Sequence, residues 1–206
     1  MSASRFEEAY EGTPPWDIGR AQPAFERVVG AGLVSGPVLD AGCGTGENAL
    51  FFASRGFQAV GVDAVEAAVT AARAKAAARG VTAEFLVHDA LALGELGRRF
   101  GTVVDSGLFH TFDDGERPLY VASLAAATAL RARVFVLCFS ERELGDGGPR
   151  RVTQAELRQA FDAPPFRVVD IETAEMATNL GGGRKAWLAS IERVAAPRSW
   201  AAVAEG

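Results

Sequence analysis

One short run of residues limits the possible folds of this chain more than any other feature. It reads Val38-Leu-Asp-Ala-Gly-Cys-Gly-Thr-Gly46, an apolar segment that ends at Asp40 and enters a glycine-rich turn. Such a turn between a strand and a helix is typical of a nucleotide-binding corner, because glycine lets backbone N–H groups approach a ligand closely. The run therefore predicts an α/β protein with a nucleotide site at residues 42–46.

Asp40 indicates which nucleotide this turn would bind. In a dinucleotide site the glycine turn holds a pyrophosphate, and an acid just before the turn would repel that group. The glycines also depart from the G-x-G-x-x-G spacing, because the sixth position counted from Gly42 is Glu47. A cationic cofactor fits better: S-adenosylmethionine carries a sulfonium and an α-ammonium, and Asp40 could bind the ammonium directly or through water. A nicotinamide dehydrogenase is correspondingly disfavoured.

Two further acids end the next two apolar segments. Asp63 lies 23 residues after Asp40, a spacing at which an acid reaches the ribose hydroxyls of a nucleotide. Asp89 ends the following segment, where it could accept a hydrogen bond from the adenine amine. Either acid alone would more often be a helix cap or a turn residue. Three acids at the ends of three successive apolar segments form a much more specific pattern.

Strand and helix patterns alternate along most of the chain. Strands are expected at residues 37–41, 58–63, 82–87, 100–106, 133–139, 166–173 and 185–193, and helices at 21–33, 47–55, 64–79, 116–130 and 153–161. This order predicts a Rossmann-like, doubly wound, seven-stranded sheet that is mostly parallel. The last two strands have no helix between them, so they are expected to form a hairpin with one antiparallel strand near the C-terminus. Residues 1–194 would form a single domain, with 1–20 as an N-terminal lid segment and 195–206 as a flexible tail.

Composition and charge narrow the class of partner. The 206 residues carry a net charge of −5 and no long run of lysine or arginine, which argues against a nucleic-acid substrate. Cys43 and Cys138 do not have metal-ligand spacing, and no metal is expected. Residues 1–11 lack the pattern of a signal peptide, and no apolar run is long enough to span a membrane. A cytoplasmic protein without a membrane partner, either a monomer or a homodimer, is therefore expected.

The chain resembles a known family over roughly residues 14–194. Similarity to class I S-adenosylmethionine-dependent methyltransferases is carried by Val38–Gly46, Val60-Gly-Val-Asp63, His88-Asp-Ala90 and Phe100-Gly-Thr-Val-Val-Asp105. Similarity to bacterial small-molecule methyltransferases of the heterocyclic toxin and thiopurine methyltransferase-like group is carried by Trp16-Asp-Ile-Gly-Arg20, Asp105-Ser-Gly-Leu-Phe-His110 and Gly148-Pro-Arg-Arg-Val-Thr153. The resemblance implies that S-adenosylmethionine gives a methyl group to a small acceptor and leaves as S-adenosylhomocysteine.

The predicted cofactor site combines strand ends, the glycine turn and the N-terminal segment, since ligands of open α/β sheets bind beyond the carboxyl ends of the strands. Arg20 is expected to pair with the methionine carboxylate, and Trp16 to present its ring to the acceptor or the sulfonium. The cofactor-binding residues predicted on these grounds and from the resemblance are Trp16, Arg20, Asp40, Ala41, Gly42, Gly44, Asn48, Asp63, Ala64, Asp89, Ala90, Asp105 and Ser106.

The segment Asp105–Phe112 is the predicted acceptor site. His110 is expected to act as a general base, and the alternative is a histidine that only hydrogen-bonds the loop backbone. Phe109 and Phe112 could stack on a planar acceptor, although one of the two is expected in the core. The predicted catalytic residues are therefore His110 and Asp105, and the predicted substrate-binding residues are Tyr10, Trp16, Phe109, His110, Phe112 and Arg150.

The expected reaction is methylation of an N or O atom of a small planar heteroaromatic compound, such as a secondary metabolite or toxin. Methyl transfer needs no covalent enzyme intermediate, so positioning is expected to supply most of the catalysis. One alternative is a thiol S-methyltransferase of the thiopurine type. Another is a non-catalytic protein that only binds S-adenosylmethionine.

Overall fold

The structure is a computed structural model that describes residues 4–145 and 147–195. Seven strands form one sheet in the order β3-β2-β1-β4-β5-β7-β6. They are β1 (Val38–Ala41), β2 (Ala59–Asp63), β3 (Glu84–Val87), β4 (Phe100–Ser106), β5 (Thr128–Phe139), β6 (Phe166–Ala177) and β7 (Gly183–Arg193). The predicted tail at 195–206 lies outside the described residues except for Ala195.

The strand directions confirm the predicted doubly wound sheet. β1 pairs in parallel with both β2 and β4, while β3 and β5 extend the parallel part on either side. β7 runs antiparallel to its two neighbours, β5 and β6, and is the one antiparallel strand. Because the chain winds outward in both directions from β1 and β4, the topological switch point lies between these two strands, where ligands of such sheets bind.

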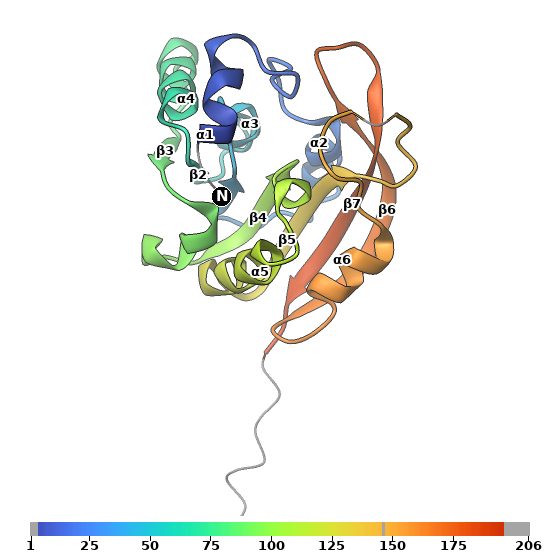
Figure 1. The fold of residues 1–206 in the computed structure, drawn as a ribbon. Coiled ribbons are helices and arrows are strands. Elements are labelled where there is room, and N and C mark those ends of the chain that lie inside the picture. The colour runs from blue at the N-terminus through green and yellow to red at the C-terminus, as the bar shows by residue number, and fades with distance from the viewer. Residues whose placement is uncertain (1–3, 146, 196–206) are drawn as a thin grey trace, which may run out of the picture.

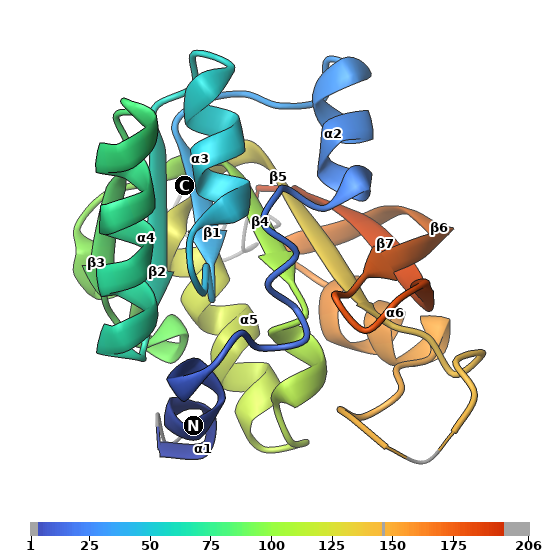
Figure 2. The same ribbon diagram turned by 90° about the horizontal axis from the view of Figure 1, so that it is seen from above.

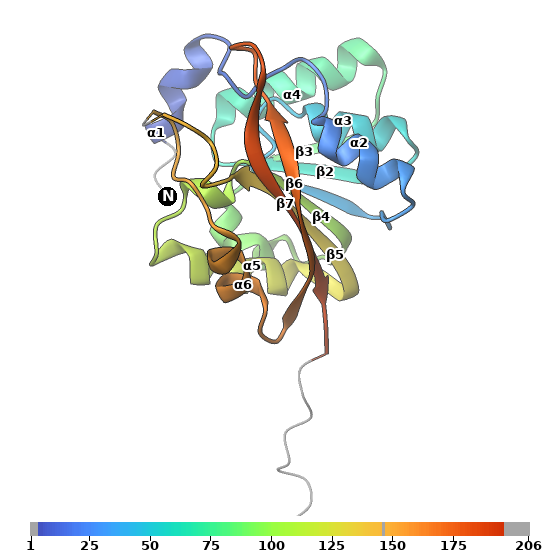
Figure 3. The same cartoon turned by 90° about the vertical axis from the view of Figure 1, so that its right-hand side faces the viewer.

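Helices cover both faces of the sheet. Figures 1 and 3 show α2 (Pro23–Gly30), α3 (Glu47–Ser54) and α4 (Glu66–Arg79) on one face, and α5 (Glu116–Ala127) and α6 (Gln154–Phe161) on the other. Short helical turns complete the chain, namely α1 (Ser4–Glu7), η1 (Glu8–Glu11), η2 (Ala90–Leu96) and η3 (Phe109–Thr111). No helix among the described residues combines the length and apolar character needed to cross a membrane.

The two faces of the sheet bury separate apolar cores. On the face of α5 and α6, Tyr120 and Phe161 are fully buried against strand residues. On the opposite face, Phe25 of α2 and Phe52 of α3 pack together with ring centroids 6.4 Å apart. Burial of these apolar faces against the sheet stabilises the three-layer arrangement.

The elements differ in places from those expected from the sequence. The helix expected over residues 116–130 ends at Ala127, and β5 begins at Thr128. Thr128 pairs with Phe100, and the register then shifts at Arg131, which adopts a positive φ of 66°. Strand pairing therefore overrides the helix-favouring alanines and leucine of this region. Another difference is the short helical stretch at residues 4–11, where no helix was expected.

Candidate active site

A cavity of about 880 Å³ opens at the carboxyl ends of the parallel strands. Its floor comes from the loops that follow β1 to β5, and its walls come from the N-terminal segment and the tip of the β6–β7 hairpin. Figures 1 and 3 both show α1 and the segment after β5 at this end of the sheet, and Figure 2 shows the same end from above. The cavity therefore lies at the switch point that the topology defines.

The structure brings most of the predicted site residues together at this cavity. Those that border it are Tyr10, Trp16, Gly42, Asp63, Ala64, Asp89, Ala90, Ser106, His110, Phe112 and Arg150. Those that do not border it are Arg20, Asp40, Ala41, Gly44, Asn48, Asp105 and Phe109. Some residues of the second group lie directly beneath or beside the cavity, and the others lie away from it.

Asp40 lies buried beneath the glycine turn. Its Oδ2 atom accepts a hydrogen bond from the backbone N–H of Ala49 at 3.1 Å. Its Oδ1 atom is buried and has no hydrogen-bond partner among the described residues. Burial raises the pKa of the Asp40 carboxyl to about 7, and the nearby Asp105 and Asp63 add to this rise. A cationic group bound nearby would satisfy the unpartnered oxygen and favour the ionised carboxylate.

The glycine turn fits tightly between its neighbours. A Cβ atom at Gly46 would lie 2.7 Å from the Phe85 ring and 2.8 Å from the Cβ of Ala72, and its φ is +87°. The backbone of Gly44 lies under Tyr10, whose hydroxyl would be 3.1 Å from a Cβ there. Glycine is therefore required both for the backbone conformation and for the close approach of other groups.

Asp63 and Asp89 lie on the cavity wall, as the strand-end pattern predicted. Asp63 accepts the backbone N–H groups of Gly44 and Val65, both at 2.9 Å. Asp89 caps the turn that follows it by accepting the N–H of Leu91 at 2.9 Å. Each acid is thus fixed in place by the backbone at the border of the cavity.

The N-terminal segment forms one wall of the cavity through aromatic side chains. Trp16 donates a hydrogen bond from Nε1 to the Tyr10 hydroxyl at 3.3 Å, and the two rings meet edge to face. Phe6 contacts the other side of the Trp16 ring with centroids 6.1 Å apart. Burial raises the pKa of the Tyr10 hydroxyl, so this group stays protonated. Arg20 is exposed and away from the cavity, contrary to its predicted contact with a methionine carboxylate.

Several polar contacts that the sequence does not predict hold this segment in place. The Asp17 carboxylate accepts hydrogen bonds from the Thr45 hydroxyl at 2.7 Å and from Lys75 at 3.1 Å. Lys75 also pairs with Glu47 at 2.7 Å. We call these residues the Asp17 latch. Their partners are distant in the sequence, and nothing in the local pattern around residue 17 points to them.

The tip of the β6–β7 hairpin holds the same segment from the other side. Asn179 donates from its side chain to the Pro14 carbonyl and from its backbone to the Pro15 carbonyl, both at 2.9 Å. Gln22 is bonded through its side chain to both backbone groups of Ala177, and its N–H donates to the Asn48 side chain at 3.0 Å. Asn48 therefore braces the chain rather than bordering the cavity.

Asp105 is an internal support of the acceptor loop. It is fully buried, and it accepts the N–H groups of Leu108 at 2.8 Å and Phe109 at 3.0 Å and the hydroxyl of Tyr120 at 2.9 Å. Burial raises its pKa to about 7, against the effect of these hydrogen bonds. The expectation that Asp105 contacts the cofactor or acts in catalysis is not met by this geometry, because its oxygens face the loop and α5.

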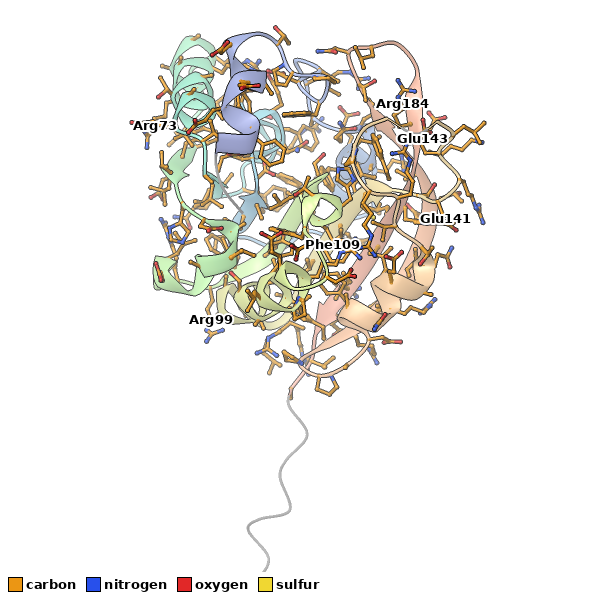
Figure 4. The ribbon with its side chains drawn as sticks, in the orientation of Figure 1. Arg73, Arg99, Phe109, Glu141, Glu143 and Arg184 are labelled. Carbon is orange, nitrogen blue, oxygen red and sulfur yellow. The ribbon has the colours of Figure 1, made fainter. Side chains whose placement is uncertain are left out.

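The two phenylalanines of this loop have different surroundings. Phe109 is fully buried against Phe161, with ring centroids 5.3 Å apart, and Figure 4 shows it in the interior of the molecule. Phe109 is thus the one of the two rings that packs in the core, as expected for one of them, and it does not border the cavity for the predicted stacking on an acceptor. Phe112 borders the cavity and packs on Tyr120 at 4.7 Å.

His110 borders the cavity with one ring nitrogen already engaged. Its Nδ1 atom accepts the backbone N–H of Phe139 at 3.0 Å, so the neutral ring carries its proton on Nε2. Burial lowers the pKa of His110 to about 3, and the positive charges of Arg151 and Arg117 lower it further. The ring is therefore neutral and presents a donor to the cavity. This arrangement disfavours the predicted general base, because the lone pair of a protonated Nε2 belongs to the ring π system and cannot accept a proton.

Arginines from the segment after β5 and from β7 border the cavity on the acceptor side. Arg150 pairs with Asp114 at 2.6 Å and also with Glu156. Arg184 lies 3.4 Å from Glu143, and Figure 4 shows these two residues close together near the hairpin tip. Arg150 already pairs with Asp114 and Glu156, so an acceptor that contacted Arg150 would compete with these two carboxylates.

The strand order, the switch point and the acids at the strand ends define a Rossmann-like nucleotide-binding protein. A family model described as a methyltransferase domain matches residues 38–130. The 2-heptyl-1-hydroxyquinolin-4(1H)-one methyltransferase of Mycobacteroides abscessus is 38% identical over 188 residues, which cover 86% of this chain and 82% of that relative. The chain belongs to the S-adenosylmethionine-dependent methyltransferases, and S-adenosylmethionine is its methyl donor.

Two further relatives match nearly the whole chain. The probable thiol methyltransferase 2 of Arabidopsis thaliana is 28% identical over 180 residues, 85% of this chain and 79% of that protein. A solved structure concerned with the conversion of a disulfide bond into a thioacetal group during echinomycin biosynthesis is 34% identical. It superposes with a TM-score of 0.86 and covers 94% of this chain and 93% of its own. The fold is therefore shared along almost its full length.

Proposed function

We propose that this methyltransferase acts on an N or O atom of a small planar heteroaromatic compound. The observation that carries the proposal is the aromatic lining of the cavity, to which Tyr10, Trp16, Phe112 and Phe139 contribute from separate parts of the chain. Flat apolar walls favour a planar ring, because aromatic surfaces stack with offset or edge-to-face geometry. The Mycobacteroides relative, named for a hydroxyquinolone, supports the same class of acceptor.

The proposed position of the cofactor follows from the residues at and beneath the cavity that could contact it. Asp63 would accept the ribose hydroxyls, while Asp89, with Ala64 and Ala90, would border the adenine. The unpartnered oxygen of Asp40 fits the α-ammonium, which would reach it beside Gly42 or through a bridging water. The cavity volume of about 880 Å³ is near the upper end of the roughly 300–1,000 Å³ usual for small-molecule sites, which suits a nucleoside and a small acceptor together.

The chain's own residues would act by positioning. The bound donor supplies a methyl group on a sulfonium, and in-line displacement requires the acceptor atom opposite the sulfur. Leu108, which packs on Gly42, and the backbone of Ser106 would border the path between cofactor and acceptor. Asp105 contributes by fixing the backbone of residues 108 and 109. Tyr10 and Trp16 would cover the reacting atoms and exclude water.

The proposal is tested by a methyl-transfer assay on the full chain. Purified protein is incubated with S-adenosylmethionine and a panel of hydroxylated N-heterocycles, phenols and thiols, and methylated products are measured by mass spectrometry. The expected result is transfer to heteroaromatic hydroxyl or ring nitrogen atoms, reduced at least tenfold in Asp63→Ala through weaker cofactor binding.

Two results would change the assignment. Transfer to thiols alone would favour an S-methyltransferase, a reading that the likeness to the Arabidopsis thiol methyltransferase supports. Tight binding of S-adenosylhomocysteine by calorimetry without transfer to any acceptor would favour a protein that binds the cofactor without catalysis.

A further inference from the structure

The hydrogen-bonding direction of His110 is fixed by its surroundings. A backbone N–H can only donate, so the bond from Phe139 at 3.0 Å leaves Nδ1 without a proton and places it on Nε2. A Cβ atom at Gly107 would lie 3.3 Å from Nε2 and 3.5 Å from the Cε of Met176. Gly107 and Met176 both border the cavity, and no described residue hydrogen-bonds to Nε2. The ring therefore offers an N–H donor at the cavity wall.

The charged groups around the ring keep it in this state. Arg117 of α5 and Arg151 of the segment after β5 are both positive and oppose a second proton on the imidazole. Asp105, at the end of β4, is occupied by Tyr120 and two backbone N–H groups. Glu143 accepts the backbone N–H of Lys185 at 2.7 Å. None of these carboxylates hydrogen-bonds to His110, so the pairing that would make it a base is missing among the described residues.

The carboxylates that border the cavity have backbone partners of their own. Asp113 accepts the N–H groups of Gly115 and Glu116, both at 2.8 Å, at the start of α5. Asp63 and Asp89 accept backbone N–H groups beneath the proposed nucleoside position. Burial raises the pKa of the Asp63 carboxyl, but Asp63 lies at the proposed nucleoside position and does not hydrogen-bond to His110. Among the described residues no carboxylate hydrogen-bonds to His110, whereas the ring offers an N–H donor to an anion.

We propose that His110 donates a hydrogen bond from Nε2 to an acceptor that binds already ionised. This inference rests on the proposed function and narrows it to acidic hydroxyl or N-hydroxyl groups of heteroaromatic rings, which lose their proton to solvent before binding. The lone pair of the oxygen anion forms the new bond to the methyl carbon, while the electron pair of the breaking carbon–sulfur bond goes to sulfur. The products are a neutral methyl ether and a neutral thioether, and no protein group takes up a proton.

The protonation state of the bound acceptor is measured directly by absorption spectroscopy. The probe is 2-heptyl-1-hydroxyquinolin-4(1H)-one, titrated with protein saturated with S-adenosylhomocysteine at one pH unit below the probe's solution pKa. The expected spectrum of the bound probe is that of its anion. A bound neutral form, or no binding of this probe at any pH, would overturn the inference.

Two substitutions of His110 separate the loss of its donor to the cavity from the loss of its bond to the Phe139 N–H. In His110→Asn the side-chain oxygen can still accept the Phe139 N–H, but the donor to the cavity is lost. In His110→Gln an amide N–H lies near the former Nε2 position. We expect kcat/KM for the ionised acceptor to fall about 10- to 100-fold in His110→Asn, mainly through KM, and to recover in part in His110→Gln. Affinity for S-adenosylhomocysteine should be unchanged in both.

The pH profile distinguishes this inference from base catalysis. Across acceptors of different acidity, the inflection of log kcat/KM should follow the pKa of each acceptor and should persist in His110→Asn. An inflection fixed at one pH for all acceptors, and lost in His110→Asn, would show that His110 is a base. Efficient methylation of acceptors that cannot ionise would overturn the inference but leave the proposed function standing, whereas no transfer to any heterocycle would overturn the proposed function itself.

Discussion

At the scale of single residues, Asp40 joins the fold to cofactor binding. Its carboxyl is buried, with one oxygen bonded to the helix that follows the glycine turn and the other without a partner among the described residues. Its pKa of about 7 means that much of the free protein holds it protonated at neutral pH. A bound ammonium would favour the carboxylate and lower this pKa, so binding would release protons.

We therefore expect affinity for S-adenosylhomocysteine to depend on pH through Asp40. Because the ligand prefers the ionised form, affinity should fall as pH decreases below about 7, by up to roughly tenfold per pH unit. Calorimetry in buffers of different ionisation enthalpy measures both the affinity and the protons released. Asp40→Asn should bind more weakly at pH 8 and lose this dependence. An unchanged pH dependence in the variant would show that another group is responsible.

Asp105 leads to a prediction about stability. Its folded pKa, about 7, lies above the value of roughly 3.9 in an unfolded chain, so the folded state binds this proton more tightly. The contribution to stability is thus fully present at low pH and is lost as pH rises from about 4 to about 7. The same sign holds for Asp40. The contribution of these two groups to the free energy of unfolding should therefore be smaller at pH 8 than at pH 5. Urea unfolding of the ligand-free protein at the two pH values measures this difference.

Tyr120→Phe tests the support under the acceptor loop. The substitution removes the hydroxyl that donates to Asp105 at 2.9 Å and leaves a buried carboxylate with fewer donors. We expect a loss of about 1–3 kcal/mol in the free energy of unfolding at pH 8, measured by urea titration. The loss should shrink at pH 5, where Asp105 is protonated and needs the donor less. An equal loss at both pH values would point to packing alone.

At the scale of elements, the N-terminal segment is a cavity wall that two sets of contacts hold at residues 14–17. Asp17 binds the glycine turn through Thr45 and α4 through Lys75, while Asn179 ties the segment to the hairpin. Arg20 is exposed and lies three residues after Asp17. The rate at which trypsin cleaves after Arg20 therefore reports whether the Asp17 latch is formed. The segment should therefore be protected only while the latch is closed.

Asp17→Asn should open this wall. The amide keeps a bond to Thr45 but loses the charge that pairs with Lys75, so trypsin should cleave after Arg20 several-fold faster. KM for the acceptor should rise more than kcat falls, since the fold of the sheet is untouched. Glu84→Gln is a matched control, because it breaks the exposed ion pair with Arg98, which lies away from the cavity. It should change neither the rate of cleavage after Arg20 nor the KM for the acceptor. Equal cleavage rates would show that the latch does not hold the segment.

The elements also show what a sequence can predict. The strand that ends at Asp40, the glycine turn and the acids Asp63 and Asp89 depend on local pattern, and the structure has them where that pattern placed them. Phe109 and Arg20 were misplaced because only tertiary packing decides which aromatic ring turns inward and which cation reaches a cavity. The strand at 128–130 was read as helix, since its partner, the start of β4, lies 28 residues earlier than Thr128. The tautomer of His110 depends on a contact with Phe139, which no local spacing reveals.

At the scale of the whole molecule, the sheet and the cavity wall are separable. The turn at residues 8–11 buries no residue of its own, yet its Tyr10 covers the glycine turn. A chain lacking residues 1–12 should therefore melt at nearly the same temperature as the full chain but transfer methyl groups at least tenfold more slowly. Differential scanning calorimetry and the transfer assay measure these two properties. A large drop in melting temperature would show instead that the segment belongs to the core.

The bond between Asn179 and Pro14 has a consequence for how the protein is made. These residues are 165 positions apart, so a ribosome adding roughly 5–20 residues per second completes the hairpin tip about 8–33 s after the segment that it holds. The parallel strands and the glycine turn emerge in between. The growing chain can thus form its nucleotide corner well before it can enclose an acceptor, and its catalytic competence arrives only with the final hairpin.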